Sequence, residues 1–186
     1  MKWNMGNRRL WLYRSLVIAT AGLMIASAVL TWWSCSIDVP AVSTKTAHVY
    51  IYEYGLRHDL VELKEYVAAD ETPTYQSVLA WAYIGLSVGL MLWSTWFKGK
   101  KGRLLLGGIG LTYIVYAAIA IFVVVANRIS DFDISLFGRS STIYTTTVDI
   151  RVSFFTTLHP GYYLAYGAGL ACIVLSLLRN RIVGNR

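Results

Sequence analysis

Charged residues are missing from four long stretches of this sequence. Each stretch is long enough to cross a bilayer, which takes about 20 mainly apolar residues. The chain as a whole is 56% hydrophobic, with a mean hydropathy of +0.50. We therefore expect an α-helical membrane protein, a four-transmembrane-helix bundle that forms a single membrane domain over 1–186. The predicted spans are residues 16–33, 77–97, 104–126 and 161–178.

The lack of ionisable groups in these spans limits what the bundle can do. Proton pumps and ion-coupled carriers place acidic or basic side chains at bilayer depth, because only function justifies their cost there. The four predicted spans contain none. The sequence therefore argues against a transmembrane proton path and against ion-coupled transport.

Cysteine and histidine are also scarce. The chain has two cysteines and three histidines. Cys35 and Cys172 fall at different predicted depths, so we expect no disulfide between them. Because His48, His58 and His159 all lie between spans, a haem held by two histidines inside the membrane is excluded.

The sequence offers no clear motif of a common catalytic site either. It contains no His-Glu-x-x-His and no phosphate-binding loop, and both the GGIG at 107–110 and the single Gly-x-Ser-x-Gly match, GLSVG at 85–89, lie inside predicted spans. We therefore predict a protein that is not an enzyme, with no catalytic, cofactor-binding or metal-binding residues. An alternative is an external metal or catalytic site, for which the candidates are His48, His58, His159, Asp131 and Asp133.

The distribution of charge predicts how the chain is threaded. Eleven of the 17 Lys and Arg lie in the N-terminal segment, the 98–103 link and the C-terminal tail, whereas all ten Asp and Glu lie in 34–76 and 127–160. By the positive-inside rule both termini are cytoplasmic, and these two loops are extracytoplasmic, in a multi-pass protein of the cell membrane. Topology and anionic lipids thus explain the net charge of +7, and we expect no nucleic-acid partner.

Tryptophan positions agree with this topology, because membrane proteins concentrate tryptophan at both bilayer interfaces. The seven tryptophans fall near the predicted inner boundary (Trp3, Trp11, Trp93 and Trp96) or the outer boundary (Trp32, Trp33 and Trp81).

The first span follows a basic segment, as a secretory signal does. Its apolar run is longer than the roughly 7 to 15 residues of a signal core, and no small-x-small cleavage site follows it, so we expect an uncleaved anchor.

Both outer loops have the composition of β-strands. The segment Ala47 to Tyr54 is rich in β-branched and aromatic residues, as are SSTIYTTTV at 140–148 and DIRVSFFTTL at 149–158. Between them, Asp59 to Val67 has apolar residues at helical spacing. We expect the two loops to form a small extracytoplasmic β-rich cap with one short helix. The candidate contact surface of this cap is Tyr50, Tyr52, Tyr54 and Tyr144.

Small residues recur at helical spacing in three of the spans. Close packing through small side chains decides which helix faces meet in a membrane, since burying leucine against leucine gains little over lipid. These faces are predicted either to pack within the bundle or to contact another subunit. The residues are Gly22 and Ala26 in the first span, Gly85 and Gly89 in the second, and Gly161, Ala165 and Gly169 in the fourth.

The topology resembles that of the claudin-like tetraspan membrane proteins. The resemblance rests on Trp32 and Trp33 after the first span, on the β-rich segments Ala47 to Tyr54 and Ser141 to Phe155, and on the short inner link. The family's first outer loop has paired cysteines, whereas this chain has only Cys35 there, so no family site residue is carried over. The resemblance implies a non-enzymatic protein that assembles side by side in the membrane and presents a β-rich surface outward.

These observations lead to one main hypothesis and one alternative. The main hypothesis is a non-enzymatic multi-pass membrane protein whose outer cap and small-residue helix faces mediate lateral assembly or extracellular contacts. Its expected partners are membrane lipids and either further copies of itself or other membrane proteins. The alternative is an accessory subunit of a larger respiratory or oxygenase-type membrane complex, whose cofactors lie in other chains.

Overall fold

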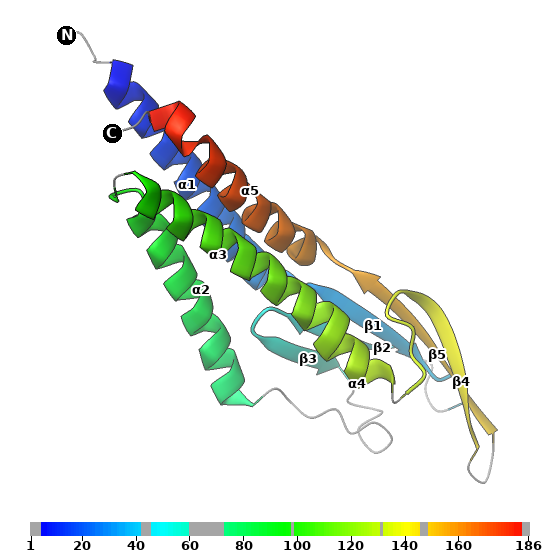
Figure 1. Cartoon of the computed structure of the whole chain (residues 1–186). Coiled ribbons are helices and arrows are strands. Elements are labelled where there is room, and N and C mark those ends of the chain that lie inside the picture. Colours follow the sequence, from blue (N-terminus) through cyan, green and yellow to red (C-terminus); the bar gives the residue numbers. More distant parts are fainter. Residues whose placement is uncertain are drawn as a thin grey trace.

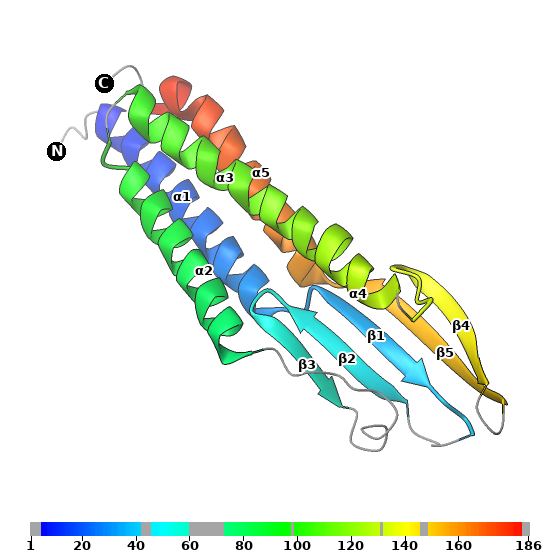
Figure 2. The same ribbon diagram turned by 60° about the horizontal axis from the view of Figure 1, so that its bottom comes forward.

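The structure consists of four long helices that run side by side and a five-stranded antiparallel sheet that extends from one end of them (Figure 1). It is a computed structural model, and it describes residues 5–41, 46–59, 73–97, 99–130, 132–145 and 149–183. All four helices are long and apolar enough to cross a membrane. Helix α1 begins and helix α5 ends at the end of the bundle away from the sheet (Figure 2).

The four long helices are α1 (Met5–Val29), α2 (Thr74–Ser94), α3 (Lys100–Ile119) and α5 (Pro160–Val183). The last three begin at or next to a proline or a glycine. Pro73 precedes α2, Gly99 precedes α3 with a φ of 64°, and Pro160 is the first residue of α5, where proline is favoured. Helix α3 continues through the π-helical segment η1 (Ala120–Val125) into α4 (Ala126–Ser130), so it is longer than the predicted span.

The end of the first predicted span is wrong. The prediction placed Trp32 and Trp33 in the membrane helix, but α1 ends at Val29 and strand β1 begins at Trp33. Backbone hydrogen bonds explain the change, because Trp32 N–H donates to Ile51 O at 2.8 Å and His159 N–H donates to Trp32 O at 2.9 Å. The first strand is thus paired from the point where the helix stops.

The sheet has five strands, more than the sequence predicted. In spatial order it runs β3-β2-β1-β5-β4. Of these, β2, β4 and β5 correspond to the predicted strands, whereas β1 and β3 were missed. Asp59 ends β3 instead of starting a helix, and the rest of the predicted helix lies outside the described residues. The strands are β1 (Trp33–Asp38), β2 (Ala47–Tyr52), β3 (Gly55–Asp59), β4 (Gly138–Thr145) and β5 (Asp149–Leu158).

One face of the sheet is part of the hydrophobic core. Strand alternation places Trp33, Cys35 and Ile37 of β1 on this face, and all three are buried. They share one apolar cluster with Ile121 and Val125 of the extended third helix. The outer part of this helix and the loop after it therefore cover the sheet (Figure 1).

The described tryptophans divide into two groups, which corrects part of the predicted belt, and Trp3 lies outside the described residues. Trp32 and Trp33 are only 1% and 2% exposed, because they fill the joint between sheet and bundle. The Trp32 ring lies edge-on to Tyr116 and Tyr162, with ring centroids 6.1 and 6.0 Å apart. The exposed tryptophans, at the positions expected for lipid interfaces, are Trp11, Trp81, Trp93 and Trp96.

Small residues in α5 allow three helices to approach closely. A Cβ on Gly169 would lie 2.9 Å from the Gly110 carbonyl oxygen of α3. A Cβ on Gly161 would lie 2.6 Å from the carbonyl oxygens of Leu30 and Thr31, where α1 ends. Ala165, between them, is fully buried. The fourth-span row therefore packs inside this chain.

The small residues of the first two spans lie elsewhere. A Cβ added to Gly22, Gly85 or Gly89 would meet nothing within 4 Å, and Ala26 is half-buried. Helix α2 is also the least enclosed span, since 22% of its most apolar window is buried, compared with 44% for α5. The faces of α1 and α2 that carry these glycines remain uncovered within the described chain.

We expect Gly161→Ala to destabilise the protein and Gly85→Ala to leave its stability unchanged or slightly increased. The first substitution forces a methyl group against two fixed backbone oxygens, and such overpacking costs about 1–3 kcal/mol. The second adds a methyl group in open space and removes a glycine from a helix interior. Thermal unfolding in detergent measures both variants. Equal melting temperatures for the two would contradict the packing described here.

Candidate functional site

A polar cluster lies where the β2–β3 hairpin enters the helical bundle. Tyr52 of β2 pairs with Gly55 of β3, which leaves Glu53 and Tyr54 as a two-residue turn at the tip. Gly55 has a φ of 150°, a conformation that side chains rarely adopt. The hairpin tip lies at the helical end of the sheet, close to α2 and α3 (Figure 2). The turn therefore carries an acidic residue into contact with the helices.

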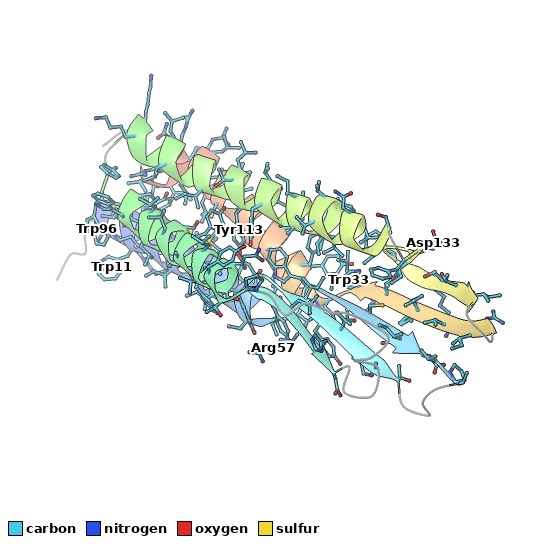
Figure 3. All side chains as sticks on the ribbon, turned by 90° about the horizontal axis from the view of Figure 1, so that it is seen from below. Trp11, Trp33, Arg57, Trp96, Tyr113 and Asp133 are labelled. Carbon is cyan, nitrogen blue, oxygen red and sulfur yellow. The ribbon has the colours of Figure 1, made fainter. Side chains whose placement is uncertain are left out.

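The carboxyl group of Glu53 is enclosed by side chains from two helices. Tyr113 Oη of α3 donates a hydrogen bond to Glu53 Oε2 at 2.8 Å and lies 3.5 Å from Ser27 Oγ of α1. Tyr116 Oη, one turn further along α3, donates to the Glu53 backbone oxygen at 3.2 Å. Glu53 is only 6% exposed. In Figure 3, Tyr113 lies in the interior, where the hairpin meets the bundle.

Within the described part of the chain, two oxygen atoms of this cluster are buried without a hydrogen-bond partner. They are Glu53 Oε1 and the hydroxyl oxygen of Tyr83, whose ring packs 5.0 Å from Tyr116 and 6.4 Å from Tyr113. Burial raises the pKa of the Glu53 carboxyl to about 7, an effect that the hydrogen bond from Tyr113 partly opposes. The cluster therefore holds a carboxyl group that can gain or lose a proton near neutral pH.

The cluster lies well inside the outer end of α2. Tyr83 is nine residues from Thr74, which corresponds to about 13 Å along the helix. At this level the exposed side chains of α2 are apolar and include Val78, Leu79 and Leu86. Glu53 thus places a titratable group beside the apolar belt of the bundle, which the charge-free spans did not predict.

Little in the sequence indicates this placement. The alternation of Tyr50, Tyr52 and Tyr54 assigned the whole segment to an outer strand, and Glu53 fell between two of these tyrosines. The glycine at position 55 is a turn signal. Because the tip inserts through hydrogen bonds with Tyr113 and Tyr116, which are about 60 residues away in the chain, no local pattern indicates its direction.

Aromatic side chains continue from this cluster to the surface. Tyr54 stacks between Tyr52 and Trp81 of α2, with ring centroids 5.3 and 5.5 Å away. The guanidinium carbon of Arg57 lies 5.7 Å from the centres of both tyrosine rings, and Arg57 is exposed. Figure 3 shows Arg57 at the edge of the molecule, beside the hairpin. Tyr50, the remaining predicted tyrosine of this loop, stacks on His48 at 5.9 Å.

Away from its foot, where Ser34 is buried, the second face of the sheet is open within the described part of the chain. The register places Tyr50, Tyr52, Ile143 and Phe155 on this face, which we call the open face. Ile143 is 62% exposed and Phe155 is 48% exposed. Tyr144 pairs with Ile150, but its side chain lies outside the described part of the structure. Among the side chains that the structure describes, the charged residues of the open face are Asp38, Arg57, Asp59, Arg139 and Arg151.

The candidate metal ligands do not come together. His159 Nε2 lies 2.8 Å from Ser34 Oγ, and His48 Nδ1 lies 3.0 Å from Ser36 Oγ. His58 is paired with Val49, one register position from His48, so it lies on the other face of the sheet. Asp133 is in the loop after α4, and Asp131 is outside the described residues. Among the described side chains, no three His, Cys, Asp or Glu form a group that could hold a metal.

At the far end of the bundle, Arg179 is buried although the sequence placed it in the cytoplasmic tail. Its guanidinium group donates hydrogen bonds to the carbonyl oxygens of Ser94, at 3.0 Å, and Phe97. Its Cζ atom lies 5.5 Å from the centre of the Tyr13 ring. A positive charge near the C-terminal carbonyls of α2 is favourable, so Arg179 fastens α2 to α1 and α5.

Comparison with known proteins adds no assignment to this geometry. The chain matches no protein-family model, and no curated protein matches it as a relative. The fold of the described residues is that of a candidate membrane protein, with four helices long and apolar enough to span a bilayer and a five-stranded sheet as a cap.

We expect the thiol of Cys35 to be unreactive in the folded protein. Both cysteines are free and buried, and burial raises the pKa of the Cys35 thiol to about 11 from 9.0. At pH 8 this shift lowers the reactive thiolate fraction roughly a hundredfold. Alkylation followed by mass spectrometry should show slow modification of Cys35 in mild detergent and fast modification after unfolding. Rapid labelling of Cys35 in the native protein would show that β1 is not buried as described.

Proposed function

We propose that this chain is a non-enzymatic multi-pass membrane protein that assembles with further copies of itself through its cap. The supporting observation is the open face of the sheet, which the bundle holds in a fixed position. Its opposite face is packed against the extended third helix, and its foot is bonded directly to α1 and α5. A rigid sheet with one free face is suited to contact a partner in a defined orientation.

The side chains of the open face support a second copy as the partner. Tyrosine and arginine are enriched at protein interfaces, and the open face carries both. It also carries charges of both signs, since Arg139 and Arg151 lie on the same sheet face as Asp38 and Asp59. A two-fold dimer brings a surface against itself, so a surface of mixed sign can pair its own charges across the contact.

The membrane part of the protein is consistent with side-by-side assembly. The faces of α1 and α2 with Gly22, Gly85 and Gly89 are open, and such faces allow close approach of helices in lipid. The claudin-like resemblance implies the same behaviour. We propose that these helix faces supplement the contact made by the cap, with both termini in the cytoplasm of a cell-membrane protein.

The alternative proposal is an accessory subunit of a larger membrane complex. It uses the same open surfaces, but the partner is a different, cofactor-bearing chain. Affinity purification in mild detergent followed by mass spectrometry distinguishes the two proposals. Recovery of this chain alone supports self-assembly, whereas stoichiometric recovery of larger subunits supports the alternative.

A crosslinking experiment tests the proposed contact directly. We expect Ile143→Cys, on the open face, to give a covalent dimer in native membranes when a short bis-maleimide is added. Phe132→Cys is the matched control, because Phe132 is 48% exposed in the loop after α4 and lies off the strands of that face. The natural cysteines are buried and should contribute little.

The dimer is measured on a denaturing gel as the fraction of chain at twice the monomer mass. A several-fold excess from Ile143→Cys over the control is the expected result. Monomer alone from Ile143→Cys, or equal crosslinking of the two variants, would contradict assembly through the open face.

A further inference from the structure

We propose that the Glu53 carboxyl is a proton-binding site that locks the β2–β3 hairpin between α2 and α3, so that loss of the proton releases the hairpin. The ligand is a proton, and the responding element is the hairpin tip. This inference is independent of self-assembly through the cap, because it concerns a contact within one chain.

Among the described residues, no positive charge lies beside Glu53 to balance a carboxylate. The facing groups are the Tyr113 and Tyr116 hydroxyls from α3, with Ser27 from α1 beyond Tyr113 and Tyr83 from α2 behind both rings. Among the described residues, the cation on the hairpin itself is Arg57. Its guanidinium group lies over the Tyr52 and Tyr54 rings and faces solvent.

The unpaired oxygen of the carboxyl group also favours the protonated form. Glu53 Oε2 accepts a hydrogen bond from Tyr113, but Oε1 is buried and has no donor. A carboxylate in this position would leave a charged oxygen uncompensated, which is among the most costly arrangements in a protein interior. Protonation removes the charge and supplies an O–H donor. The surroundings of Glu53 in the docked tip therefore suit a neutral carboxylic acid better than a carboxylate.

Loss of the proton has a defined structural consequence. The O–H bond of the carboxyl group breaks, the proton passes to water, and a carboxylate remains. That carboxylate is stabilised by leaving the cluster for water, and the tip moves with it because the turn has only two residues. Since Tyr50 and Tyr52 of the open face lie on the same hairpin, release also rearranges that face.

The direction of the pH dependence follows from the raised pKa. In the docked state the pKa of Glu53 is about 7, whereas its ordinary value is 4.5, so the docked state binds the proton more tightly. Docking is therefore most favourable below pH 4.5, weakens by up to about tenfold per pH unit between 4.5 and 7, and changes little above 7.

Hydrogen–deuterium exchange of the hairpin amides, residues 47–59, measures docking. The full-length protein in detergent is compared with Glu53→Gln at each pH, so that the intrinsic pH dependence of exchange cancels. Glutamine imitates the protonated acid and should stay docked throughout. We expect the ratio of wild-type to Glu53→Gln exchange to be near one at pH 4.5 and to rise at least tenfold by pH 8.

Two further variants separate proton binding from a merely structural role. Tyr113→Phe removes the donor that stabilises the carboxylate, so the rise in exchange should extend to higher pH than in wild type. Asp59→Asn, an exposed carboxyl on the same hairpin, should reproduce the wild-type curve. The proposal is overturned by an exchange ratio that does not change with pH. It is also overturned by a Glu53→Gln protein that fails to fold, by an unshifted Tyr113→Phe curve, or by loss of the pH response in Asp59→Asn.

Discussion

Three backbone hydrogen bonds at the foot of the sheet join the strands to the ends of α1 and α5. They run from Trp32 N–H to Ile51 O, from His159 N–H to Trp32 O and from Gly161 N–H to Thr31 O, at 2.8, 2.9 and 3.1 Å. The first two extend the pairing of β1 with its neighbours up to the end of α1, and the third joins the start of α5 to the same point. Because buried backbone groups must be paired, the strands continue into the helices without a flexible linker. The orientation of the cap on the bundle depends on this joint.

The joint also explains why the two ends of the bundle are built differently. At the sheet end, buried Trp32 and Trp33 occupy the space between strands and helices, and the β2–β3 hairpin inserts Glu53 beside α3. At the far end, Arg179 is bonded to the last carbonyl groups of α2. Among the described residues, each end therefore buries one acidic or basic side chain. Arg179 has carbonyl oxygens that match its donors, whereas Glu53 has one oxygen without a donor, and this difference makes Glu53 the group whose protonation can change the structure.

Much of the architecture could be predicted from periodicity and composition. The four apolar stretches predicted the helices to within a few residues at most ends, and DIRVSFFTTL matches β5 from its first residue to its last. β1 was missed because its short sequence WSCSID follows directly on an apolar helix and mixes polar with apolar residues. β3 was missed because GLRHD has no strong strand signal, and it is the edge strand that pairs with β2 in the described sheet.

Local patterns were enough to predict the number of membrane-length helices and the β-character of the outer loops, because both depend on properties that repeat along the chain. Which small residues pack was settled by the fold. Gly161 and Gly169 lie against neighbouring backbone, while Gly85 and Gly89, which are equally small, face outward. It also decided that Glu53 is buried among tyrosines while Asp59, on the same hairpin, is exposed. The physical reason is the same in both cases: burial is fixed by residues that are distant in sequence and adjacent only after folding.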